Sequence, residues 1–219
     1  MKEHIKGWDQ NYLGGRSNRY PFEHVVGFVM ANFSLRERSQ IKILDLGCGG
    51  GNHVKFLADE GFDYYGADGS DASIQLTLNH VGERAVGKLN VVDFANLPYE
   101  ADFFDGLIDR QSMGHNRLSD IIKIIAEIYR VLKPSGKYHG HVFGLNDGGF
   151  VNGEKNGSND YFNFSCGHFS KAYLVHGFDY NEIKQLFAAF SDVSIQRQVT
   201  YDGDSEKVIM EVYIINATK

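Results

Sequence analysis

Between residues 41 and 143, short apolar runs alternate with longer segments of helical periodicity. The apolar runs predict five buried strands, at 41–46, 64–67, 89–92, 106–109 and 138–143. The segments between them predict helices at 54–60, 72–80 and 118–132, the last with an apolar stripe along one side. Because strands and helices alternate, the pattern favours a parallel sheet with helices on both faces.

The flanking segments follow other patterns. Residues 1–40 predict a mostly helical N-terminal cap, with one helix over 23–33. Residues 144–178 are rich in Gly, Asn, Asp and aromatic residues and show little periodicity, so we expect an irregular insert. Residues 179–219 predict a helix over 179–190 and an antiparallel hairpin of two strands, 193–200 and 208–215, at the edge of the sheet. We expect all of these segments to form a single domain.

Composition narrows the class of protein. The chain has 219 residues, 42% of them hydrophobic and 23% charged, a balance typical of a globular domain. No apolar run approaches the ~18 residues of a membrane helix, and the N-terminus lacks the apolar core of a secretory signal. The two cysteines, Cys48 and Cys166, cannot form a disulfide framework, and no Cys/His group has zinc spacing. The net charge of −6, without a basic run, argues against a nucleic-acid partner. We therefore expect a cytoplasmic protein with no membrane contact and no metal site.

The segment 41–53, IKILDLGCGGGNH, contains the strongest local signal. A predicted strand leads directly into the sequence G-C-G-G-G, which begins at Gly47, and glycine lets the backbone turn tightly and approach a ligand. Open parallel sheets bind ligands beyond the carboxyl ends of their strands, which is where this loop would lie. A dinucleotide fingerprint, G-x-G-x-x-G, would place its third glycine at Asn52, so the sequence disfavours a nicotinamide cofactor.

Together with the acidic strand end Asp45, this loop resembles the first motif of the class I S-adenosylmethionine-dependent methyltransferases, an acidic residue followed by G-x-G-x-G. Later elements extend the resemblance: Asp68 ends the next strand in YYGADGS, and Asp93 follows the third strand in VVDFANLPY. The segment EIYRVLKPSGKYHGHV is similar to the family's helix, turn and fifth strand, with Ser135 in place of a glycine. The resemblance covers residues 41–143. It implies an α/β fold, a Rossmann-like three-layer sandwich whose seven-stranded, mostly parallel sheet has an antiparallel terminal strand and helices on both faces.

The resemblance implies S-adenosylmethionine as the cofactor and S-adenosylhomocysteine as its product. Asp68 would accept hydrogen bonds from the ribose hydroxyls, and Asp93 with the Phe94 backbone amide would contact adenine. The methionine end and the methyl acceptor would lie along the loop after the fourth strand, near Asp109 and Arg110. The implied cofactor-binding residues are Tyr12, Arg19, Asp45, Gly47, Cys48, Gly49, Gly51, Asp68, Gly69, Asp93, Phe94, Asp109 and Arg110. Taken singly, each acidic residue also has a structural interpretation, as a helix cap or a support for the loop.

Two segments outside the core are expected to close the site. The N-terminal cap resembles one in relatives, where aromatic and arginine side chains close over the cofactor; the candidates are Trp8, Tyr12, Arg16, Arg19 and Tyr20. Arg16 or Arg19 would pair with the cofactor carboxylate, the alternative being that both are solvated surface arginines. The insert 144–178 is expected to be the lid that recognises the acceptor. Its aromatic residues either form an apolar wall or pack the insert onto the sheet: Phe150, Tyr161, Phe162, Phe164, Phe169 and Tyr173.

A neutral hydroxyl acceptor needs a base to take its proton, and histidine titrates in the right range. Of the nine histidines, His115 is the first candidate for a catalytic residue because it follows the fourth strand. His139 and His141 share one face of a strand, where a buried neutral histidine is the commoner outcome. His168 and His176 fall in the insert and could face an acceptor.

The sequence therefore predicts methyl transfer to an O or N atom of a small-molecule acceptor, with sugar or glycan precursors and secondary metabolites as candidates. A methyltransferase acting on protein or RNA is one alternative, and a catalytically silent S-adenosylmethionine-binding protein is another. The acidic charge and the single insert favour the small acceptor over a polymer. The sequence leaves the oligomeric state open.

Overall fold

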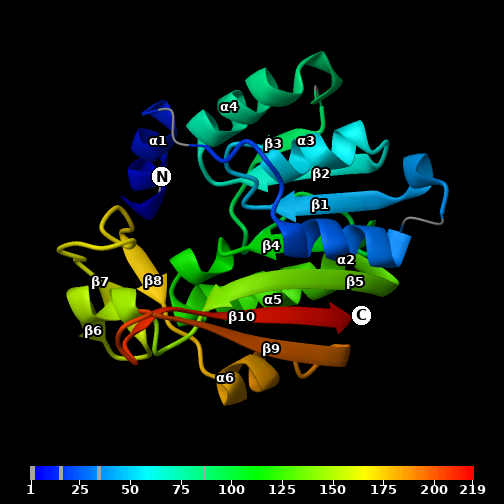
Figure 1. The fold of residues 1–219 in the computed structure, drawn as a ribbon. Coiled ribbons are helices and arrows are strands. Elements are labelled where there is room, and N and C mark those ends of the chain that lie inside the picture. The colour runs from blue at the N-terminus through cyan, green and yellow to red at the C-terminus, as the bar shows by residue number, and fades with distance from the viewer. Residues whose placement is uncertain (1–2, 15–16, 34–35, 86) are drawn as a thin grey trace.

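A seven-stranded sheet forms the centre of the protein (Figure 1). The computed structural model describes residues 3–14, 17–33, 36–85 and 87–219. The strands of the sheet are β1 (Lys42–Leu46), β2 (Asp63–Asp68), β3 (Leu89–Val91), β4 (Phe104–Arg110), β5 (Leu132–Phe143), β9 (Ser191–Tyr201) and β10 (Val208–Thr218). Their spatial order is β3-β2-β1-β4-β5-β10-β9.

The sheet is parallel except for its last strand in the chain. β10 runs antiparallel to both β5 and β9, whereas β1 to β5 pair in parallel. In Figure 1 the arrow of β10 points away from the ends toward which β1 and β2 point. The predicted sheet, mostly parallel with an antiparallel terminal strand, is confirmed. β1 lies between β2 and β4, and such a reversal of strand order creates the crevice in which open sheets bind ligands.

Helices cover both faces of the sheet, so the predicted three layers are also confirmed. α2 (Glu23–Phe33), α3 (Asn52–Asp59) and α4 (Asp71–Val81) share an apolar cluster with one face. α5 (Leu118–Val131) and α6 (Tyr180–Leu186) share the cluster on the other face. Short 3-10 helices lie at Arg38–Gln40, Glu83–Ala85, Met113–His115 and Gly148–Asn152. Within the described part of the chain, no helix has both the length and the apolar character needed to cross a membrane.

The largest differences from the predicted boundaries lie at the end of α6 and at the start of β5. α6 ends at Leu186, and the following residues Phe187 and Phe190 are buried against Tyr138 from a turn. The apolar spacing that predicted a longer helix therefore reflects burial and not helical conformation. β5 begins directly after α5, and within it Ser135 has φ +64°, a left-handed conformation that favours glycine.

The helix α1 (Glu3–Leu13) stands at the carboxyl ends of the parallel strands, beside α4 (Figure 1). Asp9 Oδ1 accepts hydrogen bonds from the Ser70 hydroxyl (2.5 Å) and the Ala72 amide (3.4 Å). Ser70 Oγ in turn accepts from the Ser73 amide (3.1 Å), which caps α4. These contacts tie α1 to the end of β2, where Asp68 lies.

The insert 144–178 contains a small antiparallel sheet that its sequence did not predict. Its strands are β6 (Glu154–Asn156), β7 (Asp160–Phe162) and β8 (Leu174–His176). The fully buried His176 places Nδ1 2.7 Å from Asp160 Oδ1 and Nε2 3.0 Å from Glu182 Oε2 of α6. Burial opposes a charge on this imidazole, but the hydrogen bonds to Glu182 and Asp160 outweigh it and raise the pKa of His176. The ring therefore holds the insert against α6.

Candidate functional site

A pocket of about 480 Å³ opens at the carboxyl ends of the parallel strands. Its walls include residues 47–50 after β1, 68–70 at the end of β2, 92–94 after β3 and 110–112 at the end of β4. This volume falls in the range of small-ligand sites, about 300–1,000 Å³. The pocket thus occupies the edge at which the strand order predicted a ligand.

The glycine loop is shaped by neighbours that leave no room for side chains. Gly47 and Gly49 have φ values of +73° and +54°, which favour glycine. A Cβ on Gly47 would lie 2.1 Å from Ser112 Cβ, and one on Gly49 would lie 2.8 Å from Tyr12 Oη. The loop is therefore pressed between the exit of β4 and α1, with its backbone on the pocket wall.

The amides of this loop are used inside the protein. The amides of Gly47 and Cys48 both donate to the Ala67 carbonyl (2.7 and 3.1 Å). The Gly49 amide donates to Asp68 Oδ2 (3.0 Å). These amides are not available to a phosphate, so the loop is poorly suited to a pyrophosphate and fits a nucleoside ligand better.

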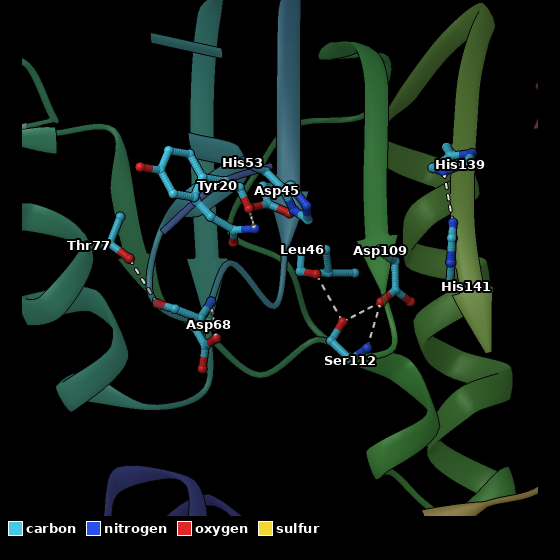
Figure 2. A network of polar contacts seen from close by, with 12 residues as sticks. Tyr20, Asp45, Leu46, His53, Asp68, Thr77, Asp109, Ser112, His139 and His141 are labelled. Atoms are coloured by element: carbon cyan, nitrogen blue, oxygen red, sulfur yellow. Dashed lines mark hydrogen bonds and ion pairs between the residues drawn. The ribbon is translucent and has the colours of Figure 1, made fainter. Parts of the chain in front are cut away.

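Asp68 closes β2 at the edge of the pocket, and Figure 2 shows it beside the glycine loop. Its carboxylate accepts hydrogen bonds from the Gly49 amide (3.0 Å) and the Ser70 amide (2.9 Å), one on each oxygen. Burial raises the pKa of this carboxyl, and the two amides oppose that rise. Each oxygen keeps a second lone pair, so the carboxylate can also accept from hydroxyls of a ligand.

Asp93 and Phe94 follow β3 and line the same pocket as Asp68. Asp93 is exposed, and its Oδ1 accepts a hydrogen bond from the Ala95 amide (3.1 Å). Gly69, which follows Asp68, and the buried Cys48 of the glycine loop also line the pocket. The structure therefore brings the acidic ends of two strands to one hollow. Their contacts with a cofactor stay predictions.

Four residues predicted to bind the cofactor do not line the pocket: Asp45, Gly51, Asp109 and Arg19. Asp45 is buried beneath the loop, with Oδ1 3.4 Å from His53 Nδ1 (Figure 2). Gly51 is the N-cap of α3 with φ +80°. Arg19 and the aromatic candidate Tyr20 are exposed outside the pocket, and Arg16 lies outside the described residues.

Asp109 stabilises the turn that follows β4. Its Oδ1 accepts from the Ser112 amide (3.0 Å), the Ser112 hydroxyl and the Met113 amide (3.3 Å) (Figure 2). The carboxyl is fully buried, and this burial raises its pKa to about 6. Alternate residues of a strand face opposite sides of a sheet, so Asp109 faces the α5 layer while Arg110 faces the pocket. Asp109 thus acts on the site through Ser112.

One wall of the pocket comes from α1, through Trp8, Asn11 and Tyr12. The Trp8 ring stacks on Tyr12 with centroids 6.1 Å apart and meets the His115 ring edge to face at 4.8 Å. Asn11 Nδ2 is buried and has no hydrogen-bond partner among the described residues. A single asparagine on a helix carries no sequence signature, so sequence reasoning missed Asn11.

The structure separates the candidate histidines. His115 and His168 line the pocket, whereas His139, His141 and His176 do not. His115 Nδ1 lies 3.1 Å from the Leu174 carbonyl, which favours a proton on Nδ1 and leaves Nε2 as the acceptor nitrogen. His168 Nε2 lies 2.7 Å from Asp147 Oδ1.

The remaining pair on β5 is buried and neutral. His139 Nε2 and His141 Nε2 lie 3.1 Å apart (Figure 2). Burial lowers the pKa of His139 to about 4 and that of His141 to about 3. Both rings are therefore uncharged near neutral pH, the common outcome for histidines inside a sheet layer. No three His, Cys, Asp or Glu side chains of the described ranges are grouped as a metal site requires.

Most aromatic residues of the insert pack within it. Phe150 and Phe164 belong to a small apolar cluster with Val175 and Val212. Phe169 belongs to the same cluster but also lines the pocket, together with Phe143 at the end of β5. The predicted aromatic wall is therefore made by one insert residue and one strand residue.

Comparisons with known proteins agree with this geometry. Residues 44–139 match the family model described as "Methyltransferase domain". A ubiquinone biosynthesis O-methyltransferase from Rickettsia akari is 27% identical over 122 residues, 55% of this chain and 47% of that protein. A second protein of that name, from Mesorhizobium japonicum, is 29% identical over 101 residues, 44% of this chain and 38% of its own. The chain thus spans less than half the length of these relatives.

Solved structures share the fold over nearly the whole chain. An S-adenosylmethionine-dependent methyltransferase from Methanosarcina mazei aligns with TM-score 0.68 at 19% identity, covering 91% of this chain and 98% of its own. The 1,6-didemethyltoxoflavin-N1-methyltransferase from Burkholderia thailandensis aligns with TM-score 0.67 at 21% identity, covering 98% and 86%. Motifs, strand order and family match point the same way. Over residues 44–139 the chain is similar to the methyltransferase domain family, and it shares its fold with S-adenosylmethionine-dependent methyltransferases of known structure.

Proposed function

We propose that this protein transfers a methyl group from S-adenosylmethionine to an O or N atom of a small-molecule acceptor. The observation that supports this most strongly is the single pocket shared by Asp68, Asp93 and the glycine loop at one end and by His115 and His168 at the other. A donor and an acceptor bound side by side in one cavity react as if within one molecule.

The cofactor end of the pocket suits a nucleoside without phosphates. Asp68 is oriented by two amides and retains lone pairs for ribose hydroxyls, and Asp93 with the Phe94 amide is placed for adenine. Tyr12 and the loop from Gly47 would border the methionine end. When bound, S-adenosylmethionine supplies an electrophilic methyl group on a sulfonium sulfur.

The acceptor end is built for positioning and proton removal. The rings of Trp8, Phe143 and Phe169 would orient an apolar body and exclude water from it. A hydroxyl acceptor would give its proton to His115 Nε2, and His168 is a second candidate among the histidines that line the pocket. An acceptor that arrives already deprotonated needs neither.

The relatives support a small acceptor and not a particular one. Ubiquinone biosynthesis, sterol and phosphoethanolamine methyltransferases are among the proteins that this chain resembles, and each is 31% identical or less. Their names span O-, C- and N-methylation. We therefore propose that the residues at the acceptor end of this pocket, and not the shared core, determine which atom of the acceptor is methylated.

Two measurements test the proposal. Calorimetry should show binding of S-adenosylmethionine and S-adenosylhomocysteine and no binding of NAD. Incubation with labelled cofactor and fractionated cell extract should then give a labelled small molecule that mass spectrometry identifies. Cofactor binding with no labelled product from any fraction would instead indicate a silent binding protein, and a labelled macromolecule would indicate a protein or RNA methyltransferase.

A further inference from the structure

Charge is divided between the two ends of the pocket. Among the described residues that line it, the acidic ones are Asp68 and Asp93, and both lie at the ends of β2 and β3. Arg110 and Lys171 lie at the other end, where β4 and the insert meet. The whole chain has a net charge of −6. The positive charge at this end of the pocket therefore differs in sign from the charge of the protein as a whole.

Arg110 is the central feature of this cationic end. Its Cζ lies 3.4 Å from the centroid of the Phe22 ring, and its Nη1 donates to Gln111 Oε1 (2.7 Å). Its Nε is buried without a hydrogen-bond partner among the described residues. Burial lowers the pKa of Arg110 to about 10, so the guanidinium still carries its charge near neutral pH.

No carboxylate among the residues that the structure describes offsets this charge. The groups facing Arg110 from neighbouring elements are Phe22 at the start of α2 and His141 on β5, and His141 is uncharged because burial lowers its pKa to about 3. No described carboxylate forms an ion pair with Arg110. A partly buried cation without a counter-ion is costly, and a bound anion removes that cost.

The cofactor does not balance this charge either. S-adenosylmethionine carries a sulfonium and an ammonium against a single carboxylate, so its arrival makes the pocket as a whole more positive. A second ligand with negative charge is therefore electrostatically favoured beside it. Pairing of that one carboxylate with Arg110 is the alternative, and the cofactor affinity of Arg110→Gln tests it. The flat apolar rings of Trp8, Phe143 and Phe169 line the same pocket as Arg110.

We infer that the acceptor is an anion with a flat, ring-shaped apolar body, and that Arg110 binds its carboxylate or phosphate group. The inference rests on the proposed function and narrows its substrate class. Guanidinium groups match carboxylates and phosphates through paired N–H donors, and stacking on Phe22 holds the Arg110 plane in place. Lys171, exposed at the rim, adds a second positive charge on the path of entry.

The test uses probes matched in shape and different in charge. Protein saturated with S-adenosylhomocysteine is titrated with 3,4-dihydroxybenzoate and with 3,4-dihydroxybenzamide, and phenyl phosphate replaces the acid in a second arm. We expect at least one anion to bind about tenfold or more tightly than the amide. The arm with the larger preference tells carboxylate from phosphate. Equal binding of anions and amide, or no binding of either anion, would overturn the inference.

Variants locate the charge that gives this preference. Arg110→Gln should reduce the preference to about one, and Arg110→Lys should restore part of it because the charge remains. Arg36→Gln is the matched control, since Arg36 is 58% exposed before β1 and pairs only loosely with Asp105 (3.9 Å). The family resemblance implies a cofactor contact for Arg110, so affinity for S-adenosylhomocysteine is measured in the same variant. If Arg110 binds the acceptor instead, this affinity stays within about twofold in Arg110→Gln. A preference that survives this variant, or a large loss of S-adenosylhomocysteine affinity, would assign Arg110 another role. Failure of the wild type to bind S-adenosylmethionine would instead refute the proposed function.

Discussion

The two ends of the pocket are built in different ways. The cofactor end is made by strand ends and tight turns, and its fixing contacts join segments that are neighbours in the sheet, such as the Gly49 amide with Asp68 (3.0 Å). The acceptor end is assembled from α1, the exit of β4 and the insert. His115 there contacts Trp8 from α1 and the Leu174 carbonyl from β8. The first end is therefore a property of the common core, and the second is a property of this chain.

This difference predicts that the two ends can be damaged separately. The insert is held by its own small sheet and by contacts with β5, β10 and α6, which lie on the other side of β4 from β1 and the loop at Gly47. A change that loosens the insert should spare cofactor binding, and a change at the cofactor end should spare the insert. The variants below test this separation, from the largest expected effect to the smallest.

His176→Gln should have the largest effect, because it leaves Asp160 and Glu182 beside an uncharged side chain. Removing one partner from a buried ionic cluster costs about 3–5 kcal/mol, and we expect a loss of this size in the free energy of unfolding of the insert. Binding of S-adenosylhomocysteine, measured by calorimetry, should be nearly unchanged, whereas methyl transfer should be lost. Lys123→Gln, at an exposed pair with Asp120, is the control and should cost less than about 1 kcal/mol.

The same histidine makes stability depend on pH. The hydrogen bonds to its two carboxylates raise the pKa of His176 above its usual value despite burial. Its stabilisation is therefore complete below the unfolded pKa of about 6.5 and is lost as pH rises through the folded pKa. Denaturant unfolding at several pH values should show the difference between wild type and His176→Gln shrinking toward alkaline pH. A difference that grows with pH would contradict a stabilising role for the positive charge of His176.

His115→Ala should lower methyl transfer by about 10²-fold or more, the usual contribution of a positioned base. The Nδ1 contact with the Leu174 carbonyl leaves Nε2 to accept the proton, and the edge contact with Trp8 holds the ring. Turnover is measured with labelled cofactor on the acceptor fraction, and affinity for S-adenosylhomocysteine should not change. His168→Ala is the comparison and should cost less than about tenfold. If the two losses are reversed, His168 beside Asp147 is the base.

The contrast between the ends also decides what the sequence could predict. The strand–glycine–helix segment and Asp68 are recognisable because each lies in a contiguous stretch whose pattern repeats across the family. The predicted strands, helices and sheet direction follow from the same local periodicity and are confirmed. The place of Asn11 on the pocket wall and the packing of Phe150 and Phe164 depend on contacts between separate segments. The strands β6 and β7 pair locally, but each has three residues, too few to show the alternation that predicts a strand.

Some residues with the right pattern lie in the wrong place. Asp45 and Asp109 follow the motif spacing, yet both are buried and outside the pocket lining. Their side chains point to the helix layers, because successive residues of a strand face opposite sides of the sheet. The residues that follow each strand form the pocket wall instead. Spacing places both residues on strands that end at the pocket, but it could not predict which atoms face the pocket.

Asp68→Ala tests the cofactor end with a smaller effect than the base variant. Loss of an ionised acceptor of hydroxyl hydrogen bonds should weaken S-adenosylhomocysteine binding by about 1–3 kcal/mol, measured by calorimetry. The Gly49 and Ser70 amides also lose their partner, so Asp68→Asn, which keeps one acceptor oxygen, is the matched control. We expect Asn to lose less affinity than Ala. Unchanged affinity in Asp68→Ala would remove the ribose role.

Asp93→Ala should have the smallest effect on affinity, about 0.5–1.5 kcal/mol, because Asp93 is exposed and water competes for its carboxylate. Its effect on selectivity is the sharper measurement. Wild type should bind S-adenosylhomocysteine more tightly than S-inosylhomocysteine, which lacks the exocyclic amine of adenine, and Asp93→Ala should narrow that gap. Asp68→Ala should weaken both ligands alike, since they share the ribose. If Asp93→Ala leaves the gap intact, adenine is recognised elsewhere, and the cofactor end depends on Asp68 and the loop alone.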